Sequence, residues 1–420
     1  MSKNFLACIR PEDVPKHFAL VIHQGTSHAF WVEAGGLGYS GLNDIATSKG
    51  PVERKLLPVN ESITDLVLAE DWLAALTATR ILIFQVSILL KENDACQPLV
   101  IASSKVDRLC ACEEYLLYLD AQKSLVAVKW GSMEGRRMND SQYISVTEVS
   151  GNKVWVIDAT KVTLECLEVP SGKVLSSIDP PEDLPQANGP DAILHAASPD
   201  LVVIGLKSTM IIMHLRDSKP CWYIWNDPVR GYEDGELIFA SVPRWCDKRG
   251  ELVLVGDTTS LDIGCAGVTD DFHSYFLTNE EFLIQMPFVK AEETYPRAIA
   301  IDYTSAEAVE PCNQDGSLLP PQPIVWIINS AGYFCPFRIV ITDKVDAHPL
   351  MKHKTIEIPV FSLNSNEQAS VAEPKSPQAA ETPGDSLGPA IEEQEEEAPI
   401  LLPMLSKLTE DHGLITNVCD

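Results

Sequence analysis

The sequence has no apolar stretch that could cross a membrane as one helix. The run Ile81–Leu90 is about half of the ~20 residues that a spanning helix needs. The stretch Ile324–Val340 is longer, but Ser330–Gly332 divides it and Pro336 stands inside its second half. The first residues, MSKNFLACIRPEDVPK, contain no apolar core of a secretory signal. We therefore expect a soluble chain with no membrane insertion.

Cysteine pairs at metal-binding or redox spacing are also missing. The 11 cysteines are scattered, and only Cys110 and Cys112 lie close together. No CxxC pair occurs, and no Cys/His group has the spacing of a zinc site. This usage predicts reduced thiols in a cytosolic or nuclear compartment.

Basic residues are scarce, with 32 Lys and Arg against 60 Asp and Glu, for a formal charge of −28. Such a surface repels nucleic-acid phosphate and anionic lipid, which argues against direct binding to either. Aromatic residues are not interleaved with basic ones, so the pattern of single-strand nucleic-acid binding is missing as well. The charge suits a basic protein partner; the simpler alternative is that it serves only solubility.

Catalytic motifs are absent too. Gly36–Gly41 matches GxGxxG, but a dinucleotide site needs a helix that starts at the last glycine. The following LNDIATSKGP has no amphipathic face, so a β-turn between strands is the better interpretation. The pair Asp270-Asp271 fits a solvated loop, and His195 and His214 stand singly in strand-like runs. We predict no catalytic residue, no metal and no cofactor, hence no enzyme.

What the sequence does contain is period-2 alternation from Phe18 to Val340, with little helical periodicity. The clearest unit is an apolar strand, a Ser-Pro-Asp turn, the strand LVVIG, a Lys-Ser-Thr turn and the strand MIIMHL. Six segments share this order: Phe18–Leu42, Ile63–Leu89, Tyr143–Val169 (preceded by the strand-like Ser124–Trp130), Asp191–Asp217, Leu237–Gly267, and Ala298–Thr304 with Ile324–Val340. Recurrence every ~40–60 residues indicates an all-β fold, a β-propeller, whose blades stack radially and cover one another.

The last module predicts a tight hairpin. Ser330–Gly332 joins two apolar strands, and such turns commonly place Gly where φ is positive. We expect this hairpin to form the inner part of the final blade. Pro336 fits near a bulge or at an edge position that donates no hydrogen bond.

The composition changes after Phe361. Residues 1–361 are predicted to form the propeller, and 362–399, rich in Pro, Ser, Ala and Glu, a disordered linker. Residues 400–420 begin with the apolar ILLPMLSKL, a short tail segment that would dock on the propeller. A chance apolar cluster, or a fragment cut from a longer chain, is the alternative.

Two stretches resemble a known family: IRPEDVPKHFALVIHQGTSHAFWVEAGGLGYSGL near the start, and YPRAIAIDYT with LLPPQPIVWIINSAGYFCPFRIV near the end. They are similar to the amino-terminal β-propellers of the cytoplasmic-filament nucleoporin CAN (nucleoporin two-hundred-and-fourteen) and its fungal counterparts. The resemblance is ordered along most of Phe5–Val340 and patchy in the middle.

The resemblance implies a seven-bladed propeller on the cytoplasmic face of the nuclear pore complex. It also implies two kinds of partner: the DEAD-box RNA helicase of messenger RNA export, and other cytoplasmic-face nucleoporins. This sequence departs from the family in two ways. Only six modules are recognisable, because about twenty residues separate Asp217 from Leu237, so one blade is reduced or the chain is a shortened form. No Phe-Gly dipeptide occurs.

The function predicted from the sequence is therefore a non-enzymatic interaction platform in the pore. The alternatives are a generic propeller scaffold outside the pore, for instance in a ubiquitin-ligase or trafficking complex, and a propeller hydrolase, which no residue constellation supports.

Propellers bind mainly through loops on their flat faces. We expect the partner to meet carboxylates there, and the candidates are Asp257, Asp262, Asp270 and Asp271. Ordinary solvated turn aspartates are the alternative interpretation for each of them.

Overall fold

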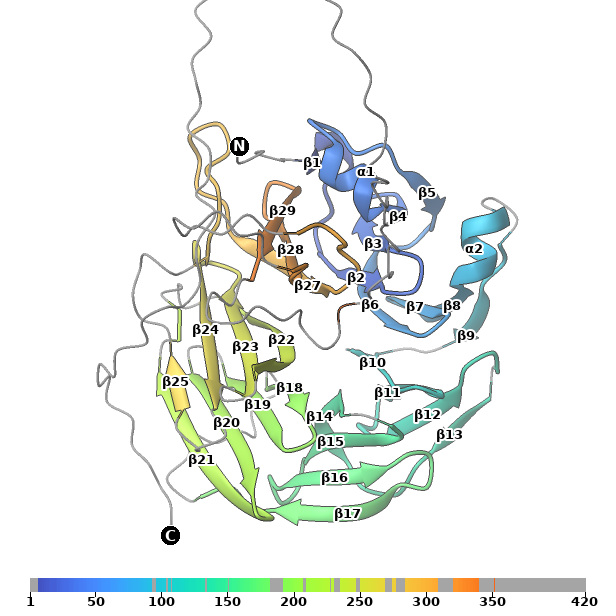
Figure 1. Cartoon of the computed structure of the whole chain (residues 1–420). Helices are drawn as coiled ribbons and strands as arrows, with labels where there is room; N and C mark the ends of the chain where they lie inside the picture. Colours follow the sequence, from blue (N-terminus) through green and yellow to red (C-terminus); the bar gives the residue numbers. More distant parts are fainter. Residues whose placement is uncertain are drawn as a thin grey trace, which may run out of the picture.

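Seven antiparallel sheets follow one another along the chain (Figure 1). The computed structural model describes residues 7–92, 96–102, 105–106, 108–132, 134–149, 151–181, 192–206, 209–226, 228–229, 235–246, 250–268, 274–276, 284–308, 320–339 and 351. Within these ranges the helices are α1 (Leu42–Thr47), α2 (Val86–Glu92) and the 3-10 turn η1 (Pro11–Asp13). No helix in the described ranges is long and apolar enough to cross a membrane.

Each of the first three blades consists of four consecutive strands. Blade 1 holds β2 (Leu20–His23), β3 (His28–Glu33), β4 (Gly36–Gly41) and β5 (Lys55–Pro58). Blade 2 holds β6 (Ile63–Ala69), β7 (Trp72–Thr77), β8 (Arg80–Gln85) and β9 (Leu99–Ala102). Blade 3 holds β10 (Leu109–Ala111), β11 (Tyr115–Leu119), β12 (Leu125–Lys129) and β13 (Gly135–Arg137).

The next three blades repeat this order. Blade 4 holds β14 (Tyr143–Glu148), β15 (Lys153–Asp158), β16 (Leu164–Glu168) and β17 (Lys173–Ile178). Blade 5 holds β18 (Ile193–Ser198), β19 (Leu201–Leu206), β20 (Thr209–Arg216) and β21 (Lys219–Asn226). Blade 6 holds β22 (Leu237–Cys246), β23 (Gly250–Asp257), β24 (Asp262–Val268) and β25 (Ser274–Phe276), and β26 (Ile284–Gln285) also pairs with β24.

Blade 7 closes the ring with strands from both ends of the described chain. Its strands are β27 (Pro296–Asp302), β28 (Ile324–Asn329), β29 (Tyr333–Arg338) and β1 (Ala7–Cys8), with β1 paired to β29. The innermost strands contact one another in the order β2, β6, β10, β14, β18, β22, β27 and back to β2. The fold is therefore a closed seven-bladed β-propeller (Figure 1).

The core lies between the blades rather than inside any one of them. Seven clusters of buried residues each join two neighbouring blades. In β28, for example, Val325 and Ile327 pack against blade 6, whereas Trp326 and Ile328 pack against blade 1. Because side chains alternate across a strand, every second residue serves a different interface. This confirms that the blades cover one another.

Polar side chains also connect the inner strands. Asp65 on β6 accepts a hydrogen bond from the backbone N–H of Leu109 at 2.8 Å, which joins blade 2 to blade 3. Gln24, just after β2, donates to the carbonyl of Ile301 at 2.8 Å and accepts from the N–H of Tyr303 at 3.0 Å. These bonds pair backbone N–H and C=O groups of the inner strands, and they connect neighbouring blades.

The structure confirms the seven blades that the resemblance implies and corrects the count of six recognisable modules. The interval Asp217–Leu237 holds β21, the fourth strand of blade 5, so no blade is reduced there. The blade missed in the sequence is blade 3. Its first and last strands, β10 and β13, are only three residues long, and β13 is exposed throughout. They leave no period-2 pattern to detect.

The GxGxxG stretch is also corrected. Gly36–Gly41 forms β4, paired on both sides with β3 and β5, and is not a turn. A helix does follow, but α1 has only six residues. Gly38 is required because a Cβ there would lie 2.7 Å from the indole nitrogen of Trp31 and from a carboxylate oxygen of Glu33. The glycines therefore serve close packing inside blade 1.

The predicted hairpin corresponds to β28 and β29, which occupy the middle of blade 7 and not its inner part, because β27 is the innermost strand. Gly332 has φ +79°, as predicted. Pro336 pairs with Trp326 on β28, and β1 reaches only Tyr333 and Phe334 in the described residues. The predicted linker 362–399 and tail 400–420 lie outside the described residues.

A candidate docking surface beside the sixth blade

The described residues contain no group of three or more His, Cys, Asp or Glu side chains that could hold a metal ion. His195, on β18, stacks on Phe239 of blade 6 with 6.0 Å between the ring centroids. Burial lowers the pKa of His195 to about 4, so the ring is neutral at physiological pH. His195 is therefore part of the packing between blades 5 and 6, and His214 lies on β20, two strands away in blade 5.

Asp257, the last residue of β23, is 4% exposed. Its Oδ1 accepts hydrogen bonds from the backbone N–H and the hydroxyl of Thr259, at 2.7 and 2.5 Å. Asp158 and Asp302 bond in the same way to the threonine two residues later, at the ends of β15 and β27. The Asp-x-Thr sequence is thus a recurring turn motif, in which the Asp carboxylate accepts hydrogen bonds from backbone N–H groups of the turn.

Asp262 lies at the other end of the same turn, as the first residue of β24. It is half-buried, and its Oδ1 is buried without a hydrogen-bond partner among the described residues. Asp262 pairs with Gln285 of β26, and Met286 donates a backbone hydrogen bond to Leu261 at 2.9 Å. The β23–β24 turn is therefore fastened to the segment that follows β26.

That segment carries an exposed aromatic residue on a tight hairpin. Phe288 is 61% exposed, the highest value among the exposed large hydrophobic side chains described. Val289 and Glu292 exchange two backbone hydrogen bonds of 3.0 Å, and Lys290 and Ala291 between them have φ of 52° and 64°. Two consecutive positive φ values are typical of a type I′ turn, which holds the hairpin in one conformation.

The hairpin is anchored at its base. Thr294, 2% exposed, donates to the carbonyl of Pro287 at 2.6 Å and accepts from the side-chain amide of Asn329 at 2.9 Å. Phe288 is therefore presented to solvent from a fixed base. An exposed aromatic side chain that is already ordered loses little conformational entropy on binding, and aromatic residues are enriched at interface hot spots.

We refer to Asp262, Phe288, Glu292 and Glu293 as the Phe288 surface. The two glutamates are exposed. An exposed aromatic residue and two exposed carboxylates on one hairpin suit a partner with apolar and basic side chains.

The sequence-predicted residues divide into three groups. Asp257 is buried in its own turn, Asp262 belongs to the Phe288 surface, and Asp270 and Asp271 lie outside the described residues. Their role in partner binding stays a prediction. Sequence reasoning missed Phe288. The available signal was a lone aromatic residue beside the polar run KAEET, outside every strand module.

Comparison with solved structures places the fold among known propellers. A chain of the S. cerevisiae complex of Dbp5 bound to Nup159, Gle1, IP6 and ADP matches with a TM-score of 0.57 at 13% identity, over 80% of this chain and 94% of that chain. The N-terminal domain of Nup159 matches with a TM-score of 0.53 at 14% identity, over 80% and 92%. The β-propeller domain of Myceliophteria thermophila Cps50 (Swd1) matches with a TM-score of 0.52 at 9% identity, over 77% and 96%.

No protein-family model matches the sequence, and no curated protein matches it either. At identities of 9–14% the structural matches show the fold. The resemblance of this chain to a Nup159-type propeller therefore holds at the level of the fold. A shared fold does not by itself imply a shared function.

Proposed function

We propose that this chain is a non-enzymatic nucleoporin propeller on the cytoplasmic face of the nuclear pore complex. Its partners would be the DEAD-box RNA helicase of messenger RNA export and other cytoplasmic-face nucleoporins. The observation that carries the proposal is the likeness of the whole propeller to the N-terminal domain of Nup159, and to a chain from a complex in which Dbp5 is bound to Nup159. The sequence resemblance at both ends of the propeller points to the same family.

The Phe288 surface is the proposed contact for the helicase. It lies on blade 6 and on the connection to blade 7, where Asp262 and β26 hold the hairpin in place. The chain carries a formal charge of −28, so a partner with a basic surface would be drawn to it over long range. Phe288 would then supply the apolar anchor.

The proposal is tested by measuring binding between the full chain and the recombinant helicase at low and at physiological salt. Exposed charges are screened over about 8–10 Å, so affinity should fall steeply between the two conditions. Replacing Asp257, Asp262, Asp270 and Asp271 together with Asn should slow association more than it speeds dissociation. Phe288→Ala should instead act mainly on dissociation, lowering affinity by about tenfold or more.

A matched control separates charge from turn stability. Asp158→Asn changes an equivalent Asp-x-Thr turn in blade 4, and it should leave helicase binding unchanged. Binding that is insensitive to salt and to the fourfold Asn substitution would rule out the four aspartates, and binding that is insensitive to Phe288→Ala would rule out the Phe288 surface.

The second candidate function is a propeller scaffold outside the pore. The Cps50 propeller matches this chain with a TM-score of 0.52, close to the 0.53 of the Nup159 domain, so this second candidate is worth testing. A pull-down from cell extract with the full chain distinguishes the two candidates. Enrichment of a DEAD-box helicase together with cytoplasmic-face nucleoporins supports the pore, whereas their absence favours the scaffold.

A further inference from the structure

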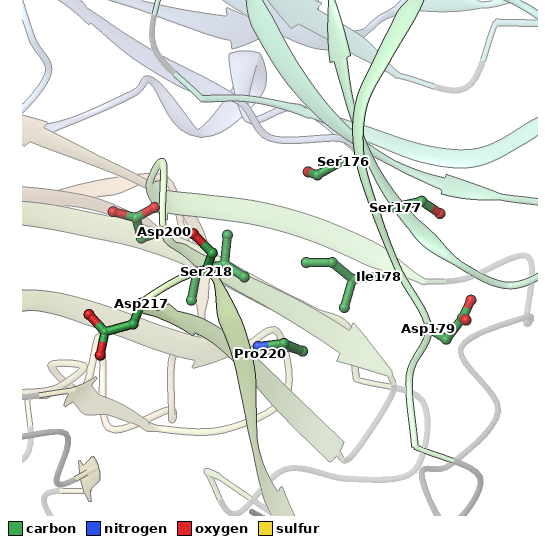
Figure 2. A pocket seen from close by; sticks show the side chains of 9 residues that line it. Ser176, Ser177, Ile178, Asp179, Asp200, Asp217, Ser218 and Pro220 are labelled. Carbon is green, nitrogen blue, oxygen red and sulfur yellow. The ribbon is translucent and has the colours of Figure 1, made fainter. Parts of the chain in front are cut away.

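A second surface lies between blades 4 and 5. An open groove of about 600 Å³ separates β17 from the turns of blade 5. One wall is Ser176–Asp179, and the other contains Asp200, Asp217 and Pro220. Figure 2 shows Ser176 and Ile178 on the side of β17 that faces this second wall. No residue of the Phe288 surface lines the groove.

The β17 wall is a strand with an unpaired edge. β17 pairs with β16 on one side, and no described strand pairs with its other side. The register shifts between Cys166 and Leu167, opposite Leu175, which marks a bulge. Val174 and Leu175 are 45% and 42% exposed. Among the outer strands described, β17 is the one that exposes two adjacent large aliphatic residues.

The groove is also acidic on both walls. Asp179 continues β17, while Asp200 and Asp217 lie in the β18–β19 and β20–β21 turns (Figure 2). None of these three carboxylates forms an ion pair with a residue that the structure describes. Figure 2 shows the Asp179 side chain on the side of β17 away from Ile178, so a segment beside β17 would have Asp200 and Asp217 on its groove side and Asp179 on its other side.

We propose that this groove binds an extended segment of a partner protein in which basic and aliphatic residues alternate. The segment adds a strand to the free edge of β17, so its backbone provides affinity. Its aliphatic side chains cover Val174 and Leu175, and its basic side chains meet Asp179, Asp200 and Asp217. An unpaired strand edge offers free backbone N–H and C=O groups to an incoming strand. The negative charge of the groove favours a segment with positively charged side chains. This surface is independent of the helicase contact.

The test uses the full chain and a fluorescent peptide, Lys-Val-Lys-Val-Lys-Val, in anisotropy titrations at low salt. Two peptides are controls: one with Glu in place of Lys, and one with Pro in place of the central Val. The proline peptide keeps the charge but loses a backbone donor and disfavours pairing. We expect binding of the first peptide only, together with slower hydrogen exchange of residues 173–179.

Matched protein variants locate the contact. Asp179→Asn, Asp200→Asn and Asp217→Asn together should weaken binding by about tenfold, the sum of three modest charge contacts. Asn is tolerated at Asp217, where φ is 49°. The control triple Glu114→Gln, Glu134→Gln and Asp140→Asn removes the same charge from exposed positions near blade 3. It should change the affinity by less than about twofold.

Four outcomes would overturn the proposal. No binding of the Lys-Val peptide is the first. Equal binding of the proline peptide would show charge attraction without strand addition. Equal weakening by the control triple would show non-specific attraction to the acidic surface. Strong exchange protection, in the chain alone, of those amides of residues 173–179 that do not bond to β16 would show that the edge is already covered. The cover would be another part of this chain or, where the protection depends on concentration, a second copy.

Discussion

At the residue scale, single polar side chains decide the shape of the turns. Asn329, fully buried at the end of β28, accepts hydrogen bonds from the backbone N–H groups of Ala331 and Tyr333, at 3.1 and 2.9 Å. Gly332 donates its N–H to the carbonyl of Asn329 at 2.9 Å. This arrangement requires the left-handed conformation at position 332, where φ is +79°, and only Gly adopts it without strain.

Gly332→Val should therefore destabilise the fold by about 3 kcal/mol. Two causes add: the positive φ, and a Cβ that would lie 2.9 Å from a methyl carbon of Val14. Gly151→Val is the matched control, because Gly151 also has positive φ, 59°, but an added Cβ there meets nothing within 4 Å. Thermal unfolding of both variants should show the larger loss at position 332. An unchanged melting temperature for Gly332→Val would contradict this account.

At the scale of one element, β14 shows how burial on an inner strand changes a carboxyl group. Glu148 ends β14, and burial together with nearby Glu113 raises its pKa to about 7. The pKa of Cys110 on β10 is raised by its hydrogen bond to Cys112 and by burial, and the nearby Glu148 carboxylate adds to this shift. The unfolded chain, with an ordinary pKa near 4.5, loses this proton at lower pH than the folded chain does. Stability from this group is therefore full below about pH 4.5 and falls as the pH rises towards about 7.

Glu148→Gln should remove that fall. Denaturation from pH 4 to pH 8 should give equal stabilities at pH 4 and a variant that is more stable at pH 8, by up to about 3 kcal/mol. Other titrating groups, such as buried Asp65, whose burial raises its pKa to about 6, are common to both proteins and cancel in the difference. Glu134→Gln, at an exposed position, should give only a small difference at every pH. A Glu148→Gln curve parallel to wild type would exclude the explanation.

At the scale of the whole molecule, the ring depends on its first described residues. Ala7 and Cys8 pair with Phe334 and Tyr333, and Ile9 donates a backbone hydrogen bond to the carbonyl of Gly332 at 2.9 Å. Ala7 and Ile9 are each 1% exposed. Further along, Arg54 of blade 1 bonds to both Asp13 and Glu33, which fastens the N-terminal segment from its other side.

Deleting residues 1–9 should therefore lower the free energy of unfolding by about 3–5 kcal/mol, because it opens blade 7 and uncovers Phe334. Deleting residues 1–6 leaves β1 in place and is the control. Urea denaturation of the two truncated chains should show the larger loss for the longer deletion. Equal losses would mean that β1 does not close the ring.

Much of the fold could be predicted because each blade repeats one pattern. The predicted module Asp191–Asp217 covers β18, β19 and β20 of blade 5, and the predicted Ser-Pro-Asp turn joins β18 to β19. The pattern failed where strands are short and exposed, as in β13, and where a fourth strand lies outside the repeated unit, as in β21. Residue propensity and hydrophobic alternation reveal only local structure. A blade whose strands show neither signal is therefore missed when blades are counted from the sequence.

The sequence by itself determined the all-β class, the repeated module, the acidic character and the positive φ of Gly332, because these depend on local pattern and composition. Tertiary structure alone decided the pairing of β1 with β29, which joins residues distant in sequence. It also decided that Asp257 is buried while Phe288 is exposed. The residues next to Asp257 and Phe288 in the sequence do not predict which of the two side chains is buried. Exposure depends on which blade or strand lies beside a residue, and that arrangement exists only once the ring has closed.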